Sequence, residues 1–228
     1  MMNASRARAC ALSGLLLAGT ALAAGPQPGD IRVTDPAEIL ELGFDPLHDE
    51  VWRAPPVEQV TDDQAAKTEA PETPSALDDP WWASVSGTDF HFRGQGAQFH
   101  AGPDMSVSCK PGSPVRTADA AIQFPGDRKL THFQAWTVDN STSAGVDVTL
   151  WEVCQSELSA NPDYRTVVSL GAVTTGTASA PGAGYASQAI PGERWVRSSI
   201  CTYFVRATFS ACANSDVRVQ KARVLWGR

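Results

Sequence analysis

The sequence contains no hydrophobic run long enough to cross a membrane. Spanning a hydrocarbon core of roughly 30 Å takes about 20 apolar residues, and the N-terminal apolar run Ala11–Ala21 is shorter than that. Arg6 and Arg8 precede this run, and the small-x-small pattern Ala21-Leu22-Ala23 follows it. These features are typical of a secretory signal peptide. We therefore expect residues 1–23 to be removed, no membrane span elsewhere, and export to the periplasm or out of the cell.

The sequence also lacks any C-x-x-C pair, a spacing that structural zinc sites often use. Of its five cysteines, Cys10 falls in the expected signal peptide, which leaves Cys109, Cys154, Cys201 and Cys212. An even number of cysteines in an exported chain predicts two disulfides. We expect disulfide bonds and no metal site.

Catalytic signatures are absent as well. The chain has no G-x-S-x-G elbow, no H-E-x-x-H helix and no G-x-x-x-x-G-K phosphate loop. Glycoside hydrolysis needs two carboxylates facing each other across roughly 5 to 9.5 Å. Asp147 and Glu152 are five residues apart on one expected strand, so they lie on opposite faces. The sequence names no catalytic residue and no cofactor, and we expect a non-enzymatic protein.

No cluster of basic residues occurs. The net charge of -7 is unevenly spread, because residues 26–80 hold fourteen Asp plus Glu against three Lys plus Arg, whereas residues 81–228 hold eleven against thirteen. The acidic excess belongs to residues 24–80, which we call the leader. A nearly neutral domain without a basic stripe offers no electrostatic footprint for nucleic acid. We expect no nucleic-acid partner.

The composition of the leader predicts that most of it is disordered. Nine prolines between residues 26 and 80, many acids and few aromatic residues leave little apolar surface to offset the entropy of ordering. A short helix is expected near residues 36–42, with Asp35 as its N-cap, Pro36 in its first turn and Gly43 at its end. Its apolar side chains either dock on the domain, stay disordered or bind a partner; we favour the first two. They are Ile39, Leu40, Leu42 and Phe44.

Residues 81–228 predict an all-β domain, an antiparallel β-sandwich of the jelly-roll type. Short runs of alternating polarity are separated by Gly, Pro, Asn, Asp and Ser, with no helical period of useful length between them. The segment is long enough for one domain with its own core. The expected strands are Asp89–Arg93, Ala97–Ala101, Ala120–Phe124, Leu130–Val138, Val146–Cys154, Arg165–Thr174, Tyr185–Ile190, Thr202–Ser210 and Val217–Trp226.

The alternation within these strands indicates which side chains point inward. The last strand changes phase, because Val217 and Val219 alternate with Arg218 whereas Ala222 and Val224 follow at a different parity. A β-bulge near Gln220 and Lys221 would absorb the extra residue. The inward residues of the two other clear strands are Val146, Val148, Leu150 and Cys154, and Tyr203, Val205, Ala207 and Phe209.

Strand geometry narrows the disulfide pairing. If residues 202–210 form one strand, Cys201 and Cys212 lie on the order of 35 Å apart, well beyond the roughly 7 Å that a disulfide spans. Two pairings remain. In a jelly roll, the strand ending at Cys154 runs antiparallel beside the strand that starts at Cys201. We therefore expect the pairs Cys154–Cys201 and Cys109–Cys212.

The stretch TVDNSTSAGVDVTLWEVC, residues 137–154, concentrates oxygen-bearing side chains between two expected strands. Trp136, Trp151, Asp139 and Asp147 are the candidate binding residues, because tryptophan rings on a sandwich face can hold sugar rings. The alternative is that the tryptophans fill the core or pair across strands. Asp139 to Gly145 is typical of a hairpin turn, and calcium would require more carboxylates. We favour a turn over a calcium site.

The pattern LTHFQAWTVDNSTSAGVDVTLWEV, with CTYFVRATFS and the closing VRVQKARVLW, resembles a loose class of exported bacterial β-sandwich modules. The resemblance covers roughly residues 118–226 and implies fold and export, but no catalytic activity and no site residue. The first hypothesis is a non-enzymatic module with a structural or binding role, whose partner is an unknown protein or glycan. The second is a carbohydrate-binding module, and the third is a hydrolase.

Overall fold

The structure is a computed structural model that describes residues 25–57, 59–61, 82–92, 97–99, 105–126, 128–155, 163–175, 182–212 and 216–227. Its strands form two sheets, here called A and B. Sheet A contains β1 (Ile31–Arg32), β2 (Asp49–Arg53), β5 (His91–Phe92), β8 (Thr117–Ile122), β10 (Val146–Gln155), β11 (Arg165–Thr174) and β13 (Cys201–Phe209). Sheet B contains β3 (Gln59–Thr61), β4 (Trp82–Ser86), β6 (Ala97–Phe99), β7 (Val107–Cys109), β9 (Lys129–Asp139), β12 (Gly182–Trp195) and β14 (Val217–Gly227). The helical segments are α1 (Pro36–Glu41) and the 3-10 turn η1 (Gly87–Asp89).

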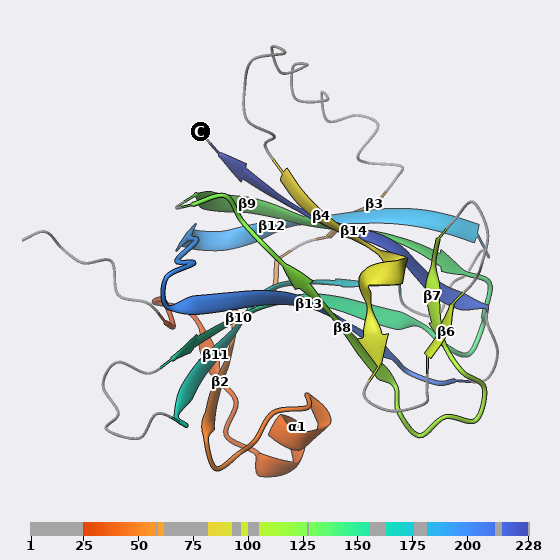
Figure 1. The fold of residues 1–228 in the computed structure, drawn as a ribbon, viewed down its shortest axis with the longest axis horizontal. Coiled ribbons are helices and arrows are strands. Elements are labelled where there is room, and N and C mark those ends of the chain that lie inside the picture. Colours follow the sequence, from red (N-terminus) through yellow and green to blue (C-terminus); the bar gives the residue numbers. More distant parts are fainter. Residues whose placement is uncertain are drawn as a thin grey trace, which may run out of the picture.

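The two sheets lie face to face (Figure 1). The strand order is β1–β2–β11–β10–β13–β8–β5 in sheet A and β3–β12–β9–β14–β7–β6 in sheet B, where β4 also pairs with β14. Among the described residues, β2 and β11 form the one parallel pair. The expected all-β class is confirmed, and the structure adds five strands that the sequence did not predict: β1, β2 and β3 in the leader, and β4 and β7 in the domain.

One hydrophobic cluster fills the space between the sheets. Sheet A contributes Val148, Leu150 and Val205, and sheet B contributes Phe133 and Val224, all at 0 % exposure. The expected alternation is therefore confirmed. The expected bulge is confirmed too, because the register of β14 against β9 shifts between Val219 and Lys221. Gln220 is the extra residue, and it lets both halves of β14 face the core.

Both expected disulfides are present. Cys154 and Cys201 lie directly opposite each other on β10 and β13, with their Cα atoms 4.1 Å apart. Cys109 and Cys212 have Cα atoms 5.5 Å apart. Cys109 ends β7 and Cys212 follows β13, so this bond joins a strand of sheet B to the end of a strand of sheet A.

The expected hairpin at residues 137–154 is wrong. β9 pairs with β12 and β14 in sheet B, whereas β10 pairs with β11 and β13 in sheet A. Residues 140–145 therefore cross from one sheet to the other instead of turning back within one sheet. Each strand already has two neighbours, so neither has a free edge for the other, although the local turn chemistry suits both kinds of connection.

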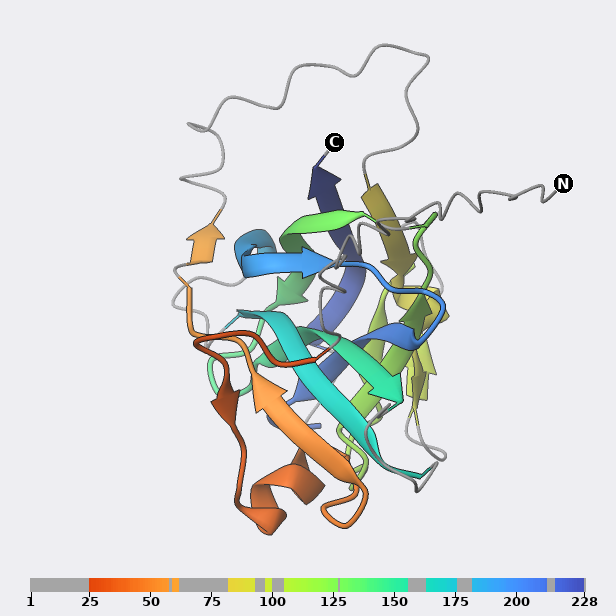
Figure 2. The ribbon, with the colours of Figure 1, turned by 90° about the vertical axis from the view of Figure 1, so that its left-hand side faces the viewer.

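The first part of the leader, residues 25–57, forms an ordered arm that packs against sheet A. The expected helix is confirmed as α1, with Asp35 at its N-cap accepting a hydrogen bond from the backbone N of Ala37 at 2.9 Å. β2 adds to the edge strand β11 (Figure 2). The expectation of a mostly disordered leader thus differs from the structure over this stretch. Residues 1–24, 58 and 62–81, including the expected signal peptide, lie outside the described residues.

The arm docks through a second hydrophobic cluster, on the outer face of sheet A. Ile39, Phe44 and Val51 of the arm pack with Trp151 of β10 and Val167 of β11. The ring centroids of Phe44 and Trp151 are 4.8 Å apart, with an angle of 65° between the ring planes. A pair of this kind adds to the free energy of burial. The arm therefore covers the outer face of sheet A around Trp151, which is why Trp151 is only 2 % exposed.

Polar contacts hold the arm at three further points. Asp30 pairs with Arg194, and both side chains are almost fully buried. The carboxylate of Asp49 accepts hydrogen bonds from Nε and Nη2 of Arg165 at 2.8 and 2.9 Å. Arg206 donates to the carbonyl of Leu42 and also pairs with Asp119. The sequence places Arg206 on the outer face, and the arm is what buries it there.

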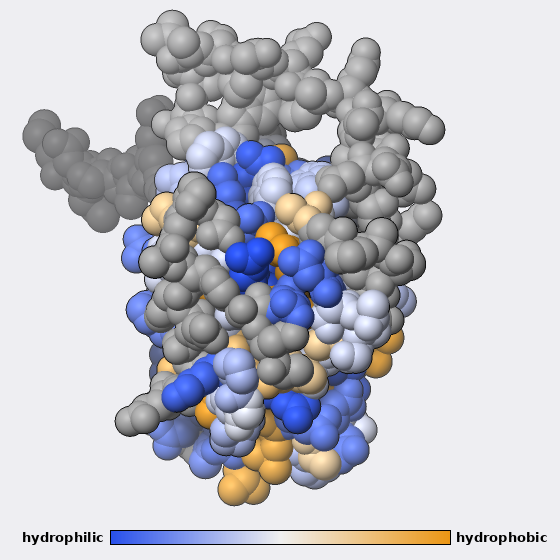
Figure 3. Space-filling view, turned by 90° about the vertical axis from the view of Figure 1, so that its right-hand side faces the viewer, coloured by the Kyte–Doolittle hydropathy of each residue, from blue (hydrophilic) through white to orange (hydrophobic). Residues whose placement is uncertain are grey.

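The surface of the arm still exposes some apolar groups. Leu40 and Leu47 are 61 % and 73 % exposed, in contrast to Ile39 at 6 %. Figure 3 shows hydrophobic residues at the lower end of the molecule, at the height where Figure 1 draws α1. Within the part of the chain that the structure describes, no helix is long and apolar enough to span a bilayer.

Replacing Phe44 with alanine should destabilise the protein by about 3 kcal/mol, because the change removes a buried ring and leaves a cavity over Trp151. Leu40→Ala is the matched control on the same arm, and its cost should stay within about 0.5 kcal/mol because Leu40 is exposed. Chemical denaturation followed by tryptophan fluorescence measures both. Equal costs for the two variants would show that the arm does not dock through Phe44.

Candidate functional site

The four predicted binding residues do not lie together. Trp151 and Asp147 are on β10 and point to the outer face of sheet A, where Asp147 is exposed and Trp151 is buried under the arm. Trp136 lies on β9 and points to the outer face of sheet B. The expected platform of Trp136 and Trp151 is therefore wrong, since the two rings lie in different sheets and on opposite sides of the sandwich.

Asp139 has a structural role at the crossing between the sheets. It is 5 % exposed. Its carboxylate accepts hydrogen bonds from the backbone N of Ser141 at 2.9 Å and from Oγ1 of Thr175 at 3.0 Å. Ser141 continues the turn by accepting from the backbone N of Ala144 at 3.0 Å. These bonds support the interpretation of residues 139–145 as a connection rather than a binding site.

Trp136 belongs instead to a row of aromatic and cationic side chains across four neighbouring strands. We call this row the aromatic–cation face. It consists of Trp82 on β4, Lys221 and Arg223 on β14, Gln134 and Trp136 on β9, and Tyr185 on β12. The register places Trp136 directly opposite both Tyr185 and Lys221, and Gln134 opposite Arg223. All six side chains therefore project from the outer side of sheet B.

The cations of this face sit between its aromatic rings. Nζ of Lys221 lies 5.3 Å from the ring centroid of Trp82 and 5.5 Å from that of Trp136. Cζ of Arg223 lies 5.7 and 4.9 Å from the same two centroids. Cation–π attraction of this kind stabilises each contact by about 0.5–1 kcal/mol at an exposed site. The side chains are thereby ordered in advance of any ligand.

Hydrogen bonds fix the other half of the face. Nε of Arg223 donates to Oε1 of Gln134 at 2.9 Å, and Nε2 of Gln134 donates to the hydroxyl of Tyr185 at 2.6 Å. The rings of Trp136 and Tyr185 are 4.9 Å apart between centroids. Trp82 has the largest exposure of the row, 42 %. The face thus offers ring surface together with several hydrogen-bonding groups.

A second cluster lies inside the sandwich around Glu152, which the sequence analysis did not select. Glu152 is on β10 at an inward position, and the hydroxyl of Tyr203 donates to its Oε1 at 2.7 Å. Burial raises the pKa of Glu152, while the Tyr203 hydrogen bond and Arg194 oppose that rise. Burial beside Glu152 also raises the pKa of Tyr203. The signal was available in the sequence, since Glu152 has the same parity as Leu150 and Cys154.

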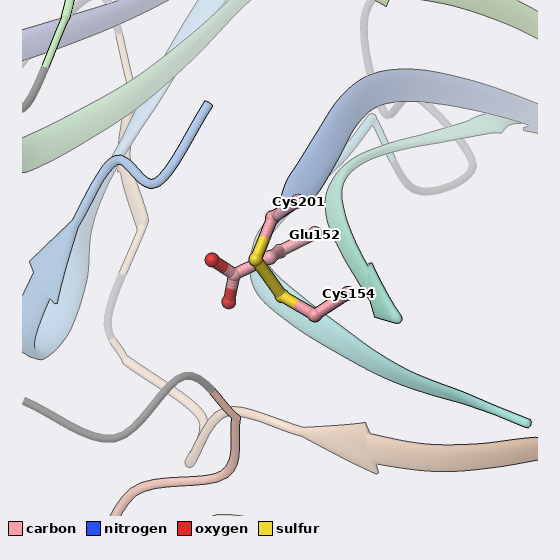
Figure 4. Close-up of side chains that lie close together, drawn as sticks. All are labelled: Glu152, Cys154 and Cys201. Carbon is pink, nitrogen blue, oxygen red and sulfur yellow. A yellow bond between two sulfur atoms is a disulfide. The ribbon is translucent and has the colours of Figure 1, made fainter. Parts of the chain in front are cut away.

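Glu152 lies close to the Cys154–Cys201 disulfide (Figure 4). One carboxylate oxygen and the two sulfur atoms lie within 4.8 Å of one another, a grouping that could hold a metal ion if the sulfurs were thiolates. The sulfurs are bonded to each other, so they do not supply thiolate ligands. Glu152 is 5 % exposed, which leaves it a buried structural acid.

Comparisons with known proteins add no assignment: no protein-family model matches the chain, and no curated protein matches it.

Replacing Glu152 with glutamine should change how stability depends on pH. Because the folded pKa of Glu152 is raised, the folded state favours the protonated acid, and the stabilisation is lost as pH rises through that pKa. Glutamine cannot ionise and keeps the acceptor for Tyr203. We expect Glu152→Gln to gain stability over the native protein as pH increases from 4 to 8, measured by denaturation at each pH.

Glu193→Gln is the control of opposite sign. The hydrogen bond from Lys129 lowers the pKa of Glu193, so its contribution is present at neutral pH and is lost as pH falls through the folded pKa. The free energy of unfolding of this variant should be slightly lower than that of the native protein at neutral pH and equal to it at acidic pH. A Glu152→Gln curve that is parallel to the native curve would contradict the burial of an ionisable acid.

Proposed function

We propose that this chain is an exported, non-enzymatic β-sandwich module that binds carbohydrate through the aromatic–cation face. The observation that carries the proposal is the row of Trp82, Trp136 and Tyr185 across neighbouring strands, with hydrogen-bonding groups between the rings. Sugar rings present C–H groups on their faces and hydroxyls at their edges. Aromatic faces meet the first, and the partly exposed side chains of Lys221 and Arg223 meet the second.

The proposed export is based on the expected signal peptide. The two disulfides are compatible with an oxidising environment outside the cytoplasm. We also propose the jelly-roll connectivity for the sandwich. The order β8–β13–β10–β11 in sheet A and the pairing of β9 with β12 in sheet B support it.

The first alternative is a structural module, in which the same row serves only as cross-strand packing that stabilises sheet B. The aromatic contacts of Trp136 on both sides agree with that role, whereas the 42 % exposure of Trp82 at the edge of the row favours a binding role. Nothing favours the hydrolase hypothesis. Asp139 and Glu152 are buried in structural contacts, and the exposed Asp147 lies on the opposite face of β10 from Glu152.

Trp82→Ala should weaken glycan binding about tenfold, since one lost stacking contact corresponds to at most about 1.5 kcal/mol. The measurement is a polysaccharide pull-down and glycan-array screen with the full mature chain, followed by titration of the bound glycan. Tyr164→Ala is the matched control, because Tyr164 is 44 % exposed but precedes β11 in sheet A. Trp82→Ala should lower the free energy of unfolding by at most about 2 kcal/mol, because it removes the cation–π contacts with Lys221 and Arg223, and the variant should stay folded under the binding conditions.

Two results would overturn the proposal. One is the absence of any bound glycan, with or without calcium. The other is a glycan whose affinity falls as much in Tyr164→Ala as in Trp82→Ala, since the binding surface would then lie elsewhere.

A further inference from the structure

Lys221 and Arg223 differ from most other basic side chains of the fold in having no carboxylate partner. Ion pairs neutralise six basic residues of the described chain. These are Arg32, Arg53, Lys129, Arg165, Arg194 and Arg206. The described contacts of Lys221 and Arg223 are instead with Trp82, Trp136 and Gln134. Two positive charges therefore remain uncompensated on one surface.

The strands around these two cations are almost free of acids. β4 and β14 contain no aspartate or glutamate. β9 and β12 contain one each, of which Asp139 is buried at the crossing and Glu193 pairs with Lys129. Asp89, which follows β4, accepts hydrogen bonds from the backbone N and Oγ of Ser86. Among the described residues, the strands of this face thus carry more basic than acidic side chains on its surface, and such a surface attracts anions.

The geometry points to an anionic polysaccharide, a chain of uronic or sulfated sugars, as the ligand of the aromatic–cation face. This inference rests on the proposed carbohydrate-binding function and specifies its ligand class. The rings of Trp82, Trp136 and Tyr185 take sugar faces. Nζ of Lys221 and Cζ of Arg223 lie 4.9–5.7 Å from the ring centroids of Trp82 and Trp136, close to where the carboxylate or sulfate groups of successive sugars would pass.

The orientation of Arg223 suits this ligand in particular. Its Nε donates to Gln134, and its Cζ lies 5.7 and 4.9 Å from the ring centroids of Trp82 and Trp136. A guanidinium held in this way keeps two parallel N–H groups for an oxyanion. Because both cations are already ordered by the rings, binding loses less side-chain entropy than it would on a surface of mobile lysines.

Single-stranded nucleic acid combines the same two chemistries, stacking rings and anionic groups. Only two cations are available here, whereas nucleic-acid binding depends on many phosphate contacts. The half-buried Tyr185 and the exposed Ser84 also provide hydroxyl groups of the kind that sugar hydroxyls use. The polysaccharide is therefore the better match, and nucleic acid becomes an outcome of the test.

The test uses the full mature chain and pairs of probes that differ only in charge. The first pair is polygalacturonate and its fully methyl-esterified form, and the second is dextran sulfate and dextran. We expect at least about tenfold tighter binding to a charged member, corresponding to about 1.4 kcal/mol. The affinity should fall as NaCl rises from about 0.05 M to about 0.5 M, because salt screens the exposed charges. Tighter binding of polygalacturonate would indicate recognition of carboxylates, and tighter binding of dextran sulfate would indicate recognition of sulfates.

Three variants connect the binding to this face. Lys221→Gln should lose about tenfold in affinity for the charged probe, whereas Lys221→Arg should retain it because the charge is kept. Lys110→Gln is the matched control, since Lys110 is an exposed lysine that follows β7 outside the face. Thermal unfolding of each variant identifies any loss of binding that comes from loss of folding.

Each failure has its own meaning. Equal affinity for the charged and neutral members of both pairs would overturn the anionic ligand while leaving the glycan-binding function intact. Binding to no polysaccharide would overturn both. Tighter binding of oligo-dT than of either charged polysaccharide would overturn the inference in favour of nucleic acid, and an equal loss in Lys110→Gln and Lys221→Gln would place the anion site elsewhere.

Discussion

The packing of Phe44 against Trp151 is the contact on which the arrangement of the two outer faces depends. It brings the arm onto sheet A, so that β10 is buried on its inner side by the core and on its outer side by residues of the arm. Without that cover, Trp151, Val167 and Phe204 would form an exposed apolar patch, which soluble proteins seldom tolerate at large size. The arm thus covers the outer face of sheet A around Trp151. The described residues of the arm do not cover the aromatic–cation face of sheet B.

Contacts with the arm also distinguish Arg165, Arg194 and Arg206 from Lys221 and Arg223. The arm provides the carboxylates that neutralise Arg165 and Arg194, and it covers Arg206 through the carbonyl of Leu42. Buried arginines need such partners, because an unpaired buried charge is strongly destabilising. Lys221 and Arg223 need none, since they are only partly buried and lie against aromatic rings. Two acidic residues of the arm, Asp30 and Asp49, therefore pair with arginines of the sandwich, whereas the described contacts of Lys221 and Arg223 are with aromatic rings and Gln134.

Periodicity was sufficient where a strand carries its own signal. The inward side of β10 and the bulge at Gln220 follow from residue alternation, whereas the pairing of Cys154 with Cys201 needed strand length together with the expected sandwich topology. Contacts between distant segments were not predictable in this way. The docking of Phe44 depends on the parallel addition of β2 to β11. The aromatic–cation face depends on the pairing of β4 with β14. The five residues of β4 are too few for their sequence pattern to predict that strand.

Local chemistry also leaves the choice between a hairpin and a crossing open, because Asp139 and Ser141 suit either connection. The crossing places Trp136 in sheet B and Trp151 in sheet A. Trp136 therefore lies on the same face as Trp82 and not beside Trp151. The most direct test is hydroxyl-radical footprinting of the tryptophans, read by mass spectrometry. The account predicts that Trp82 is oxidised readily, that Trp151 is protected, and that an anionic polysaccharide protects Trp82. Rapid oxidation of Trp151, or an unreactive Trp82 in the free protein, would contradict it.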